Sequence, residues 1–406
     1  MLALPLACTD DDDSSATSVA STSTTTTTEP VRTDDGALKI GLLLPLSGEG
    51  ATIGQGMVEA AERAVEEINS AGGVLGRQVE VERADEGADA SSASDGIATL
   101  VDEGVDAVVG PASSTVALAT LGDLLGEGKL ACSPTATALA LDAYPSSQLF
   151  FRTAPSDSLQ ADAIAKLAEQ TGLSTAAVVF LDDAYGRPLG GATVDALEAS
   201  GITVDAQIPF ASSDESLVDE ATELVDSEAD LVVVIGDGEQ GMRMLGAMGE
   251  TAGRFPDVEP PDIIVNDAVR RPPSAQLVQA LPATIRDQIE GVSPMARSQF
   301  EDEPPGPFAT NAYDCVNLIA LSAVQAGEDN PTQIAAWMTE TSARGQPCRS
   351  YESCVALLAD DRNIDYEGPG GTVQIGSNGD PEQARFDVFE FDESGVDVSS
   401  APLIIP

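Results

Sequence analysis

The stretch that decides the fold starts at residues 38–45, LKIGLLLP, an apolar run with the length and composition of a buried strand. An amphipathic segment follows at Gly56–Ser70, and Gly72-Gly73 mark where its helix should end. One face of that helix is apolar at Met57, Ala61, Ala64 and Ile68. A buried strand followed by an amphipathic helix is the unit from which parallel sheets are built, so this segment predicts an α/β fold.

The same alternation fills most of the chain. Further strands are expected at 79–83, 106–110, 130–133 and 150–153, with helices at 91–102 and 116–126. The pattern then restarts, with strands at 176–181, 203–208, 231–236 and 263–265 between helical segments. We therefore predict two Rossmann-like α/β lobes with a ligand cleft between them, joined by a three-strand hinge.

The predicted boundaries follow from this repeat. The chain should cross between lobes near residues 155, 291 and 383. The N-terminal lobe then comprises 37–155 and 292–382, and the C-terminal lobe 156–291 and 383–400. Residues 9–36 are rich in Ser, Thr and Asp, with Thr24–Thr28 unbroken, and are expected to form a flexible tether.

Composition excludes several classes of function. The 406 residues carry a formal charge of −49, from 19 basic and 68 acidic side chains, and this charge disfavours nucleic-acid binding. Histidine is absent, so Ser-His-Asp triads and imidazole metal sites are excluded. The acidic run Asp10–Asp13 lacks the spacing of a calcium loop, and we interpret the charge as a solvated surface. No metal or cofactor is expected.

The N-terminus and the cysteines predict export. Residues 1–7, MLALPLA, precede Cys8 and the polar tether, and together they resemble a bacterial lipoprotein signal with Cys8 as the lipidated residue. Pro5 departs from that motif, and a chance cysteine is the alternative. Four cysteines remain. Cys348 and Cys354 enclose five residues and should form a loop disulfide, which leaves Cys132-Cys315 by elimination or as two buried thiols.

Polar residues gather after the predicted strands of the first lobe. Pro111-Ala112-Ser113-Ser114-Thr115 follows one strand, and Pro134-Thr135-Ala136-Thr137 follows another. Hydroxyls and free N–H groups at helix N-termini can bind a carboxylate, although Ser and Thr at such positions also serve simply as caps. Both loops should lie at one sheet edge, which favours an anionic group bound between them.

Acids follow the strands of the second lobe. They are Asp182-Asp183 with Tyr185 close behind, Asp237 and Asp267. Acids at turns are often only solvated or capping. Facing the hydroxyl loops of the other lobe, however, they could neutralise an ammonium group. The predicted cleft therefore suits a zwitterion.

Seven segments give a resemblance that covers about residues 38–395. They are IGLLLPLSGEGATIGQG, AVEEINSAGGVLGRQVEV, VVGPASS, SPTAT, FFRTAPSDSLQA, DDAYGR and YDCVNLIALSA. The chain resembles the type I periplasmic binding proteins, specifically the leucine/isoleucine/valine-binding family of ABC importers.

The resemblance implies a solute-binding protein outside the cell, with an ABC permease as partner and a monomeric state. It implies that Ser113 or Ser114, Thr135 and Thr137 hold the ligand carboxylate. Tyr185 would come from the second lobe, Asp267 would bind the ammonium, and Asp237 is a weaker candidate. Ile53, where the family often has an aromatic, and Thr135, where a smaller residue is common, leave the side-chain specificity open.

Three alternatives stay open. A ligand-sensing receptor of the same fold would signal to a partner and feed no transporter. Amides or urea-like compounds could replace the amino acid as ligand. Gly236–Gly241 spells GxGxxG between a strand and a helix, so a dinucleotide enzyme is the third alternative. Asp237 and Glu239 place negative charge where a pyrophosphate would sit, and we expect binding without catalysis.

Overall fold

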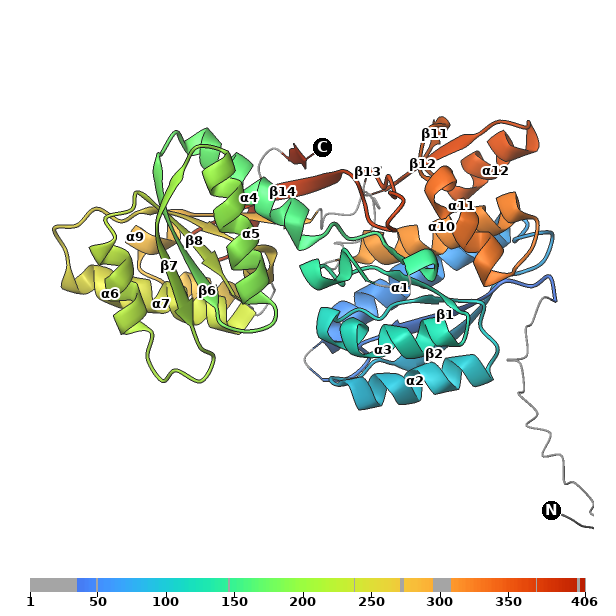
Figure 1. The fold of residues 1–406 in the computed structure, drawn as a ribbon, viewed down its shortest axis with the longest axis horizontal. Coiled ribbons are helices and arrows are strands. Elements are labelled where there is room, and N and C mark those ends of the chain that lie inside the picture. Colours follow the sequence, from blue (N-terminus) through green and yellow to red (C-terminus); the bar gives the residue numbers. More distant parts are fainter. Residues whose placement is uncertain are drawn as a thin grey trace, which may run out of the picture. The chain divides into compact units, whose positions relative to one another are not determined.

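The computed structural model describes residues 35–48, 50–144, 147–236, 238–270, 274–294, 308–369, 371–399 and 402–405. The predictions for Cys8, for the tether up to residue 34 and for Asp237 lie outside these ranges. The described part contains a parallel sheet, a larger mixed sheet and one small sheet, together with the connecting helices (Figure 1). The predicted α/β architecture is therefore present.

The first sheet has five parallel strands in the order β2-β1-β3-β4-β5. Their bounds are β1 Lys39–Leu44, β2 Glu80–Asp85, β3 Ala107–Val109, β4 Leu130–Ser133 and β5 Phe150–Arg152. Connecting helices are α1 Ala51–Ser70, α2 Ala90–Asp102 and α3 Ser114–Gly126. The later segments α10 Ala309–Ala326, α11 Pro331–Thr341 and α12 Tyr351–Ala359 return to this lobe, and α10 packs on α1 (Figure 1). Leu42, Met57 and Val316 share one buried core.

The second sheet has the order β15-β14-β10-β9-β8-β6-β7, with β16 also paired to β14. Its strands are β6 Thr175–Leu181, β7 Thr203–Phe210, β8 Leu231–Ile235, β9 Asp262–Val265, β10 Ile289–Pro294, β14 Ala384–Phe391, β15 Asp397–Ser399 and β16 Leu403–Ile405. Its helices include α4 Asp157–Thr171, α5 Gly186–Ala199, α6 Val218–Asp226 and α7 Gly238–Arg254, with the shorter α8 Ser274–Ala280 and α9 Ala283–Arg286. Strand β14 runs antiparallel to β10, β15 and β16, whereas the others are parallel.

Strand β10 was not predicted, and it lies where the sequence pattern predicts that the chain crosses between lobes. It pairs with β14 as far as Pro294 opposite Phe386, so the boundary expected at residue 291 falls inside this strand. The lobe boundaries as such stay a prediction. The first helix begins at Ala51, five residues before the predicted start at Gly56.

Both predicted disulfides are present. Cys132 on β4 is bonded to Cys315 on α10, which joins segments 183 residues apart. Cys348 is bonded to Cys354 beside the small sheet of β11 Gln346–Cys348, β12 Ile364–Gly368 and β13 Gly371–Thr372. Cross-links across long loops stabilise mainly by restricting the unfolded chain, so the first should contribute more than the second.

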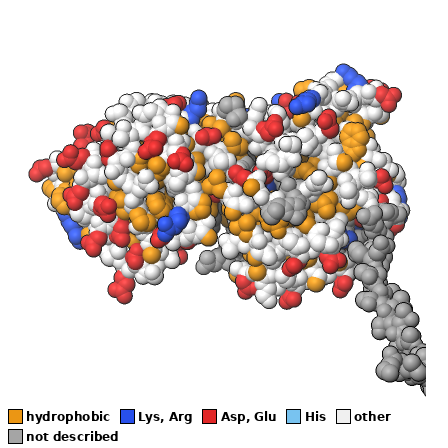
Figure 2. Space-filling view, viewed as in Figure 1, with side chains coloured by type: hydrophobic (Ala, Val, Ile, Leu, Met, Phe, Trp, Pro, Cys, Tyr) orange, Lys and Arg blue, Asp and Glu red, His pale blue; other side chains and the backbone are white. Residues whose placement is uncertain are grey.

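The visible face of the molecule carries many acidic side chains (Figure 2). They are spread over this face and do not gather in one patch (Figure 2). In the described part of the chain, no helix has the length and apolarity to span a bilayer.

Candidate ligand-binding site

The first hydroxyl loop follows β3 and is shaped by a glycine. Gly110 has φ +126°, and a side chain there would bring its Cβ to 2.1 Å from the carbonyl oxygen of Leu43. Only glycine therefore lets the chain turn so close to β1. Ser113 is the N-cap of α3, and its hydroxyl accepts a hydrogen bond from the N–H of Val116 at 3.4 Å. Ser113 is exposed, so it caps the helix at the rim of the site.

The second hydroxyl loop, after β4, is joined to the first. The hydroxyl of Thr135 donates to the carbonyl oxygen of Ala112, and the N–H of Ala138 donates to Ser114 Oγ at 3.2 Å. Ser114 and Thr135 are thus engaged in holding the two loops together. The structure brings these loops to one edge of the first sheet, as their positions after neighbouring strands predict.

A buried acid supports the first loop, and sequence reasoning missed it. Glu86 follows β2 directly and is fully buried. Its two carboxylate oxygens accept hydrogen bonds from the N–H groups of Ala112 and Ser113, each at 2.7 Å. Burial raises the pKa of Glu86 to about 7 against the effect of these two hydrogen bonds, and the neighbouring charge of Asp85 raises it further. Its position after a strand at the same sheet edge is the signal that could have found it.

Thr137 meets the start of α4. The N–H of Asp157 donates to the carbonyl oxygen of Thr137 at 2.9 Å. The Asp157 side chain is buried, with 2% of its residue surface exposed, and its Oδ1 has no hydrogen-bond partner. Burial raises the pKa of Asp157 to about 7, a hydrogen bond from the Thr137 side chain lowers it, and the charge of Asp267 raises it. Sequence reasoning missed this residue as well, although it lies within the FFRTAPSDSLQA segment.

Tyr185, Asn266 and Asp267 come together beyond the carboxyl ends of β6 and β9. The buried Asn266 donates from Nδ2 to Tyr185 Oη at 2.9 Å, and its Oδ1 accepts from the N–H of Gly236 at 3.3 Å. Gln160 on α4 donates from Nε2 to Asp267 Oδ1 at 2.8 Å. Asp267 therefore lies near the amino end of α4, the end that carries Asp157.

The GxGxxG segment has a packing explanation. Gly236 ends β8 and Gly241 lies in α7, and a Cβ on Gly236 would be 2.8 Å from the nitrogen of Gly241. The close approach of the strand end to the helix requires a small residue at position 236. These glycines are thus accounted for without a phosphate.

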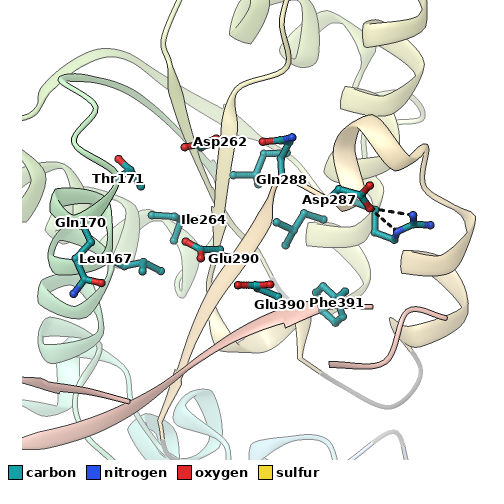
Figure 3. Close-up of a pocket in the computed structure, with 13 residues that line it drawn as sticks. Leu167, Gln170, Thr171, Asp262, Ile264, Asp287, Gln288, Glu290, Glu390 and Phe391 are labelled. Atoms are coloured by element: carbon teal, nitrogen blue, oxygen red, sulfur yellow. Dashed lines mark hydrogen bonds and ion pairs between the residues drawn. The ribbon is translucent and has the colours of Figure 1, made fainter. Parts of the chain in front are cut away.

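A separate cavity lies at the opposite end of the second sheet (Figure 3). Its volume is about 500 Å³, and Asp262, Glu290 and Glu390 line it from β9, β10 and β14. Asp262 begins β9, whereas Asp267 follows its end, so this cavity is distinct from the candidate site. Glu290 and Glu390 are directly paired across the two strands. The pKa of Glu290 is raised, chiefly by burial and further by the negative charges of Glu390 and Asp262.

Replacing Glu390 by Lys should stabilise the fold by about 0.5 kcal/mol, because a like-charged cross-strand pair becomes an oppositely charged one. Urea unfolding checks this, with Glu393→Lys as the control of equal charge change in the nearby turn. An equal gain in both variants would assign the effect to net charge.

The candidate site consists of hydroxyls, carboxylates and one tyrosine. Thr137 of the second hydroxyl loop contacts Asp157 at the start of α4. Gln160 of the same helix contacts Asp267, and Tyr185 contacts Asn266 beside it. Within the described residues, no group of three or more acidic or cysteine side chains could hold a metal ion. This arrangement defines a two-lobed α/β solute-binding protein.

Comparison with known proteins gives the family. Residues 37–384 match the family described as periplasmic binding protein, and the chain therefore belongs to it. A "Chemotactic signal transduction system substrate-binding protein BasB" of Halobacterium salinarum is 29% identical, covering 83% of each chain. The "Leu/Ile/Val-binding protein BraC3" of Rhizobium johnstonii is 27% identical, covering 74% of this chain and 82% of its own.

A solved structure shares the fold. The branched-chain amino acid transporter substrate-binding protein LivJ of Streptococcus pneumoniae, in complex with isoleucine, superposes with a TM-score of 0.68 at 22% identity. It covers 91% of this chain and 99% of its own.

Proposed function

We propose that the chain is the extracytoplasmic solute-binding protein of an ABC importer and captures a small amino acid, branched-chain-like, or a related carboxylate. Closure of the two lobes around the ligand would present the complex to the permease. The names of the Rhizobium and Streptococcus proteins support the ligand class. The hydroxyl loops would receive the carboxylate, and the acids of the second lobe would receive the ammonium.

The unpartnered Oδ1 of Asp157 carries this proposal. It is a buried carboxylate oxygen next to a second carboxylate, Asp267, whose charge raises its pKa. Asp157 is buried and Asp267 is half-buried, and two neighbouring acids there are costly unless cations lie close. The charge of Arg152 lowers the pKa of Asp157 but offsets only part of this cost, because the pKa stays raised. A ligand ammonium would supply further positive charge, and Thr137, which contacts Asp157, would place the ligand carboxylate on the other side.

A thermal-shift screen tests the ligand class. Residues 37–406 would be unfolded and refolded to remove carried ligand, then screened against amino acids, short amides, polyamines and NAD. A ligand at about 100 times its Kd stabilises by about 2.7 kcal/mol, which is a shift of several degrees. A shift with aliphatic amino acids supports the proposal. A response to amides alone would leave the ammonium role of the acids without support, and one to NAD alone would overturn the proposal.

Thr137→Ala should weaken amino-acid binding by about 1–3 kcal/mol, because a buried polar contact to the ligand carboxylate is lost. Isothermal titration calorimetry measures the change. Thr99→Ala is the matched control, since Thr99 is an exposed residue of α2 whose hydroxyl donates to the carbonyl oxygen of Asp95 in the same helix. Equal affinity in Thr137→Ala and the native chain would place the carboxylate elsewhere.

A sensory role is the second candidate, and the name of the Halobacterium salinarum relative, a substrate-binding protein of a chemotactic signal transduction system, favours it. Both roles need the same ligand site. They differ in the cell: deletion of an importer component abolishes uptake of radiolabelled ligand, whereas deletion of a sensor abolishes only the tactic response.

The lipid anchor belongs to the same proposal. Cys8 followed by a Ser/Thr/Asp tether supports attachment of a monomer to the outer face of the cell membrane. Cys8→Ala should move the protein from the membrane to the soluble fraction, while native protein stays with the membrane. Equal fractionation of the two would rule out lipidation at this residue.

A further inference from the structure

We propose that Glu86 is a positioning residue for the ligand site, holding the first hydroxyl loop from beneath through the N–H groups of Ala112 and Ser113. The inference rests on the proposed function, because it concerns how the ligand site is kept in its binding conformation. Glu86 is fully buried, so it would act on the ligand through the loop that it holds and not by direct contact.

The geometry supports this role. Each oxygen of Glu86 accepts one N–H at 2.7 Å, so a single side chain fixes two successive peptide groups. These peptides immediately precede α3, whose N-terminus favours a negative charge. The loop they belong to carries Ser113 and Ser114 and is tied to the second loop through Ala112 and Ala138. Glu86 therefore holds the first hydroxyl loop directly and contacts the second only through the first.

The same geometry decides which groups remain for a ligand. Because the N–H groups of Ala112 and Ser113 point to Glu86, they are not available to a ligand carboxylate. The ligand must use hydroxyls and later N–H groups at this edge. Protonation of Glu86 turns one acceptor oxygen into a donor that faces an N–H, so the loop would lose one of its two supports.

Glu86→Gln imitates the protonated acid, and the test compares it with the native chain over a range of pH. At pH 8 we expect the Kd for an aliphatic amino acid to rise about tenfold, as for one unsatisfied buried hydrogen-bonding group. At pH 5.5 the ratio of the two Kd values should approach one, because native Glu86 is then protonated. Asp157, whose pKa is also about 7, titrates in both proteins, so its contribution cancels in this ratio. The pKa of Asp85 is lowered from its ordinary value, so Asp85 stays ionised over this range.

Controls separate a positioning role from general damage. Asp314→Asn is matched, because Asp314 is a buried acid of the same lobe whose pKa burial raises to about 8 and whose Oδ1 accepts from Tyr366 at 2.7 Å. Its Kd ratio to the native chain should stay near one. A ratio for Glu86→Gln that is near one at pH 8, or constant from pH 5.5 to 8, would overturn the proposal.

A measurement on the native chain covers the case in which Glu86→Gln does not fold. In amide NMR spectra of ligand-free protein, the Ala112 and Ser113 protons should shift together with one midpoint near pH 7. Separate midpoints or no shift would contradict the proposal. Because this needs no ligand, its outcome is independent of whether the chain binds an amino acid. Binding with a flat amide titration would reject Glu86 alone.

Discussion

Arg152→Met is expected to lower the free energy of unfolding by about 3–5 kcal/mol, the cost of removing one partner from a buried ion pair. Arg152 ends β5 and is fully buried. Its Nε donates to Asp380 at 2.6 Å and its Nη2 to Asp142 at 2.6 Å. Methionine fills much of the space but leaves both carboxylates without their cation.

The position of these partners explains why the loss should be large. Asp142 also accepts from the hydroxyl of Ser156, the N-cap of α4, at 2.7 Å. The guanidinium further donates to the carbonyl oxygens of Ala136 and Ala138 at 3.2 and 3.3 Å, so it supports the second hydroxyl loop. One side chain thus connects that loop, the start of α4 and the segment before β14.

Urea unfolding measures the loss, with Arg187→Met as control. Arg187 also pairs with an acid, Asp182, but both side chains are substantially exposed. Exposed pairs contribute about 0–1 kcal/mol, so the control should change little. Similar losses in the two variants would show that the buried ion pairs of Arg152 contribute no more to the free energy of unfolding than an exposed pair does.

Local patterns account for the parts of the fold that were predicted. Strands such as LVVVIG at 231–236 are continuous apolar runs, and such runs mark parallel strands covered on both faces. Strand β10 escaped prediction because its sequence, IEGVSP, mixes a charge, a glycine and a proline. Its strand character comes from pairing with β9 and β14, which only the folded chain provides.

The placement of the candidate site's residues was predicted in part, and their roles in binding stay predictions. The strand-end rule found the two hydroxyl loops and the Tyr185 and Asp267 region. Capping by Ser113 was the alternative that the sequence left open, and it uses Val116, only three residues away. The rule could not tell that Thr135 joins the loops, since that use depends on Ala112, which is distant in sequence. Glu86 and Asp157 were missed because burial of a charged side chain is a tertiary property, and most acids in so acidic a chain are solvated.

Asp267→Asn is expected to weaken amino-acid binding by about 2–5 kcal/mol, from loss of a buried charge pair with the ligand ammonium. Gln160 holds Asp267 through a hydrogen bond at 2.8 Å, and an asparagine could keep that contact with its oxygen. The variant therefore removes charge while preserving shape, so the effect measures electrostatics. Calorimetry with a branched-chain amino acid gives the affinity, and Asp262→Asn, at the other end of β9, is the control.

The pH dependence of the binding affinity provides a second test of the same acids. The pKa of Asp157 is about 7 in the ligand-free chain, raised chiefly by burial. An ammonium beside it favours the ionised form, so binding should release protons and affinity should rise as the pH increases through 7. Asp157→Asn should weaken binding at pH 8 and reduce this slope. If neither Asp157→Asn nor Asp267→Asn changed the affinity, these acids would not bind the ligand ammonium. A ligand without a positive charge would then be favoured.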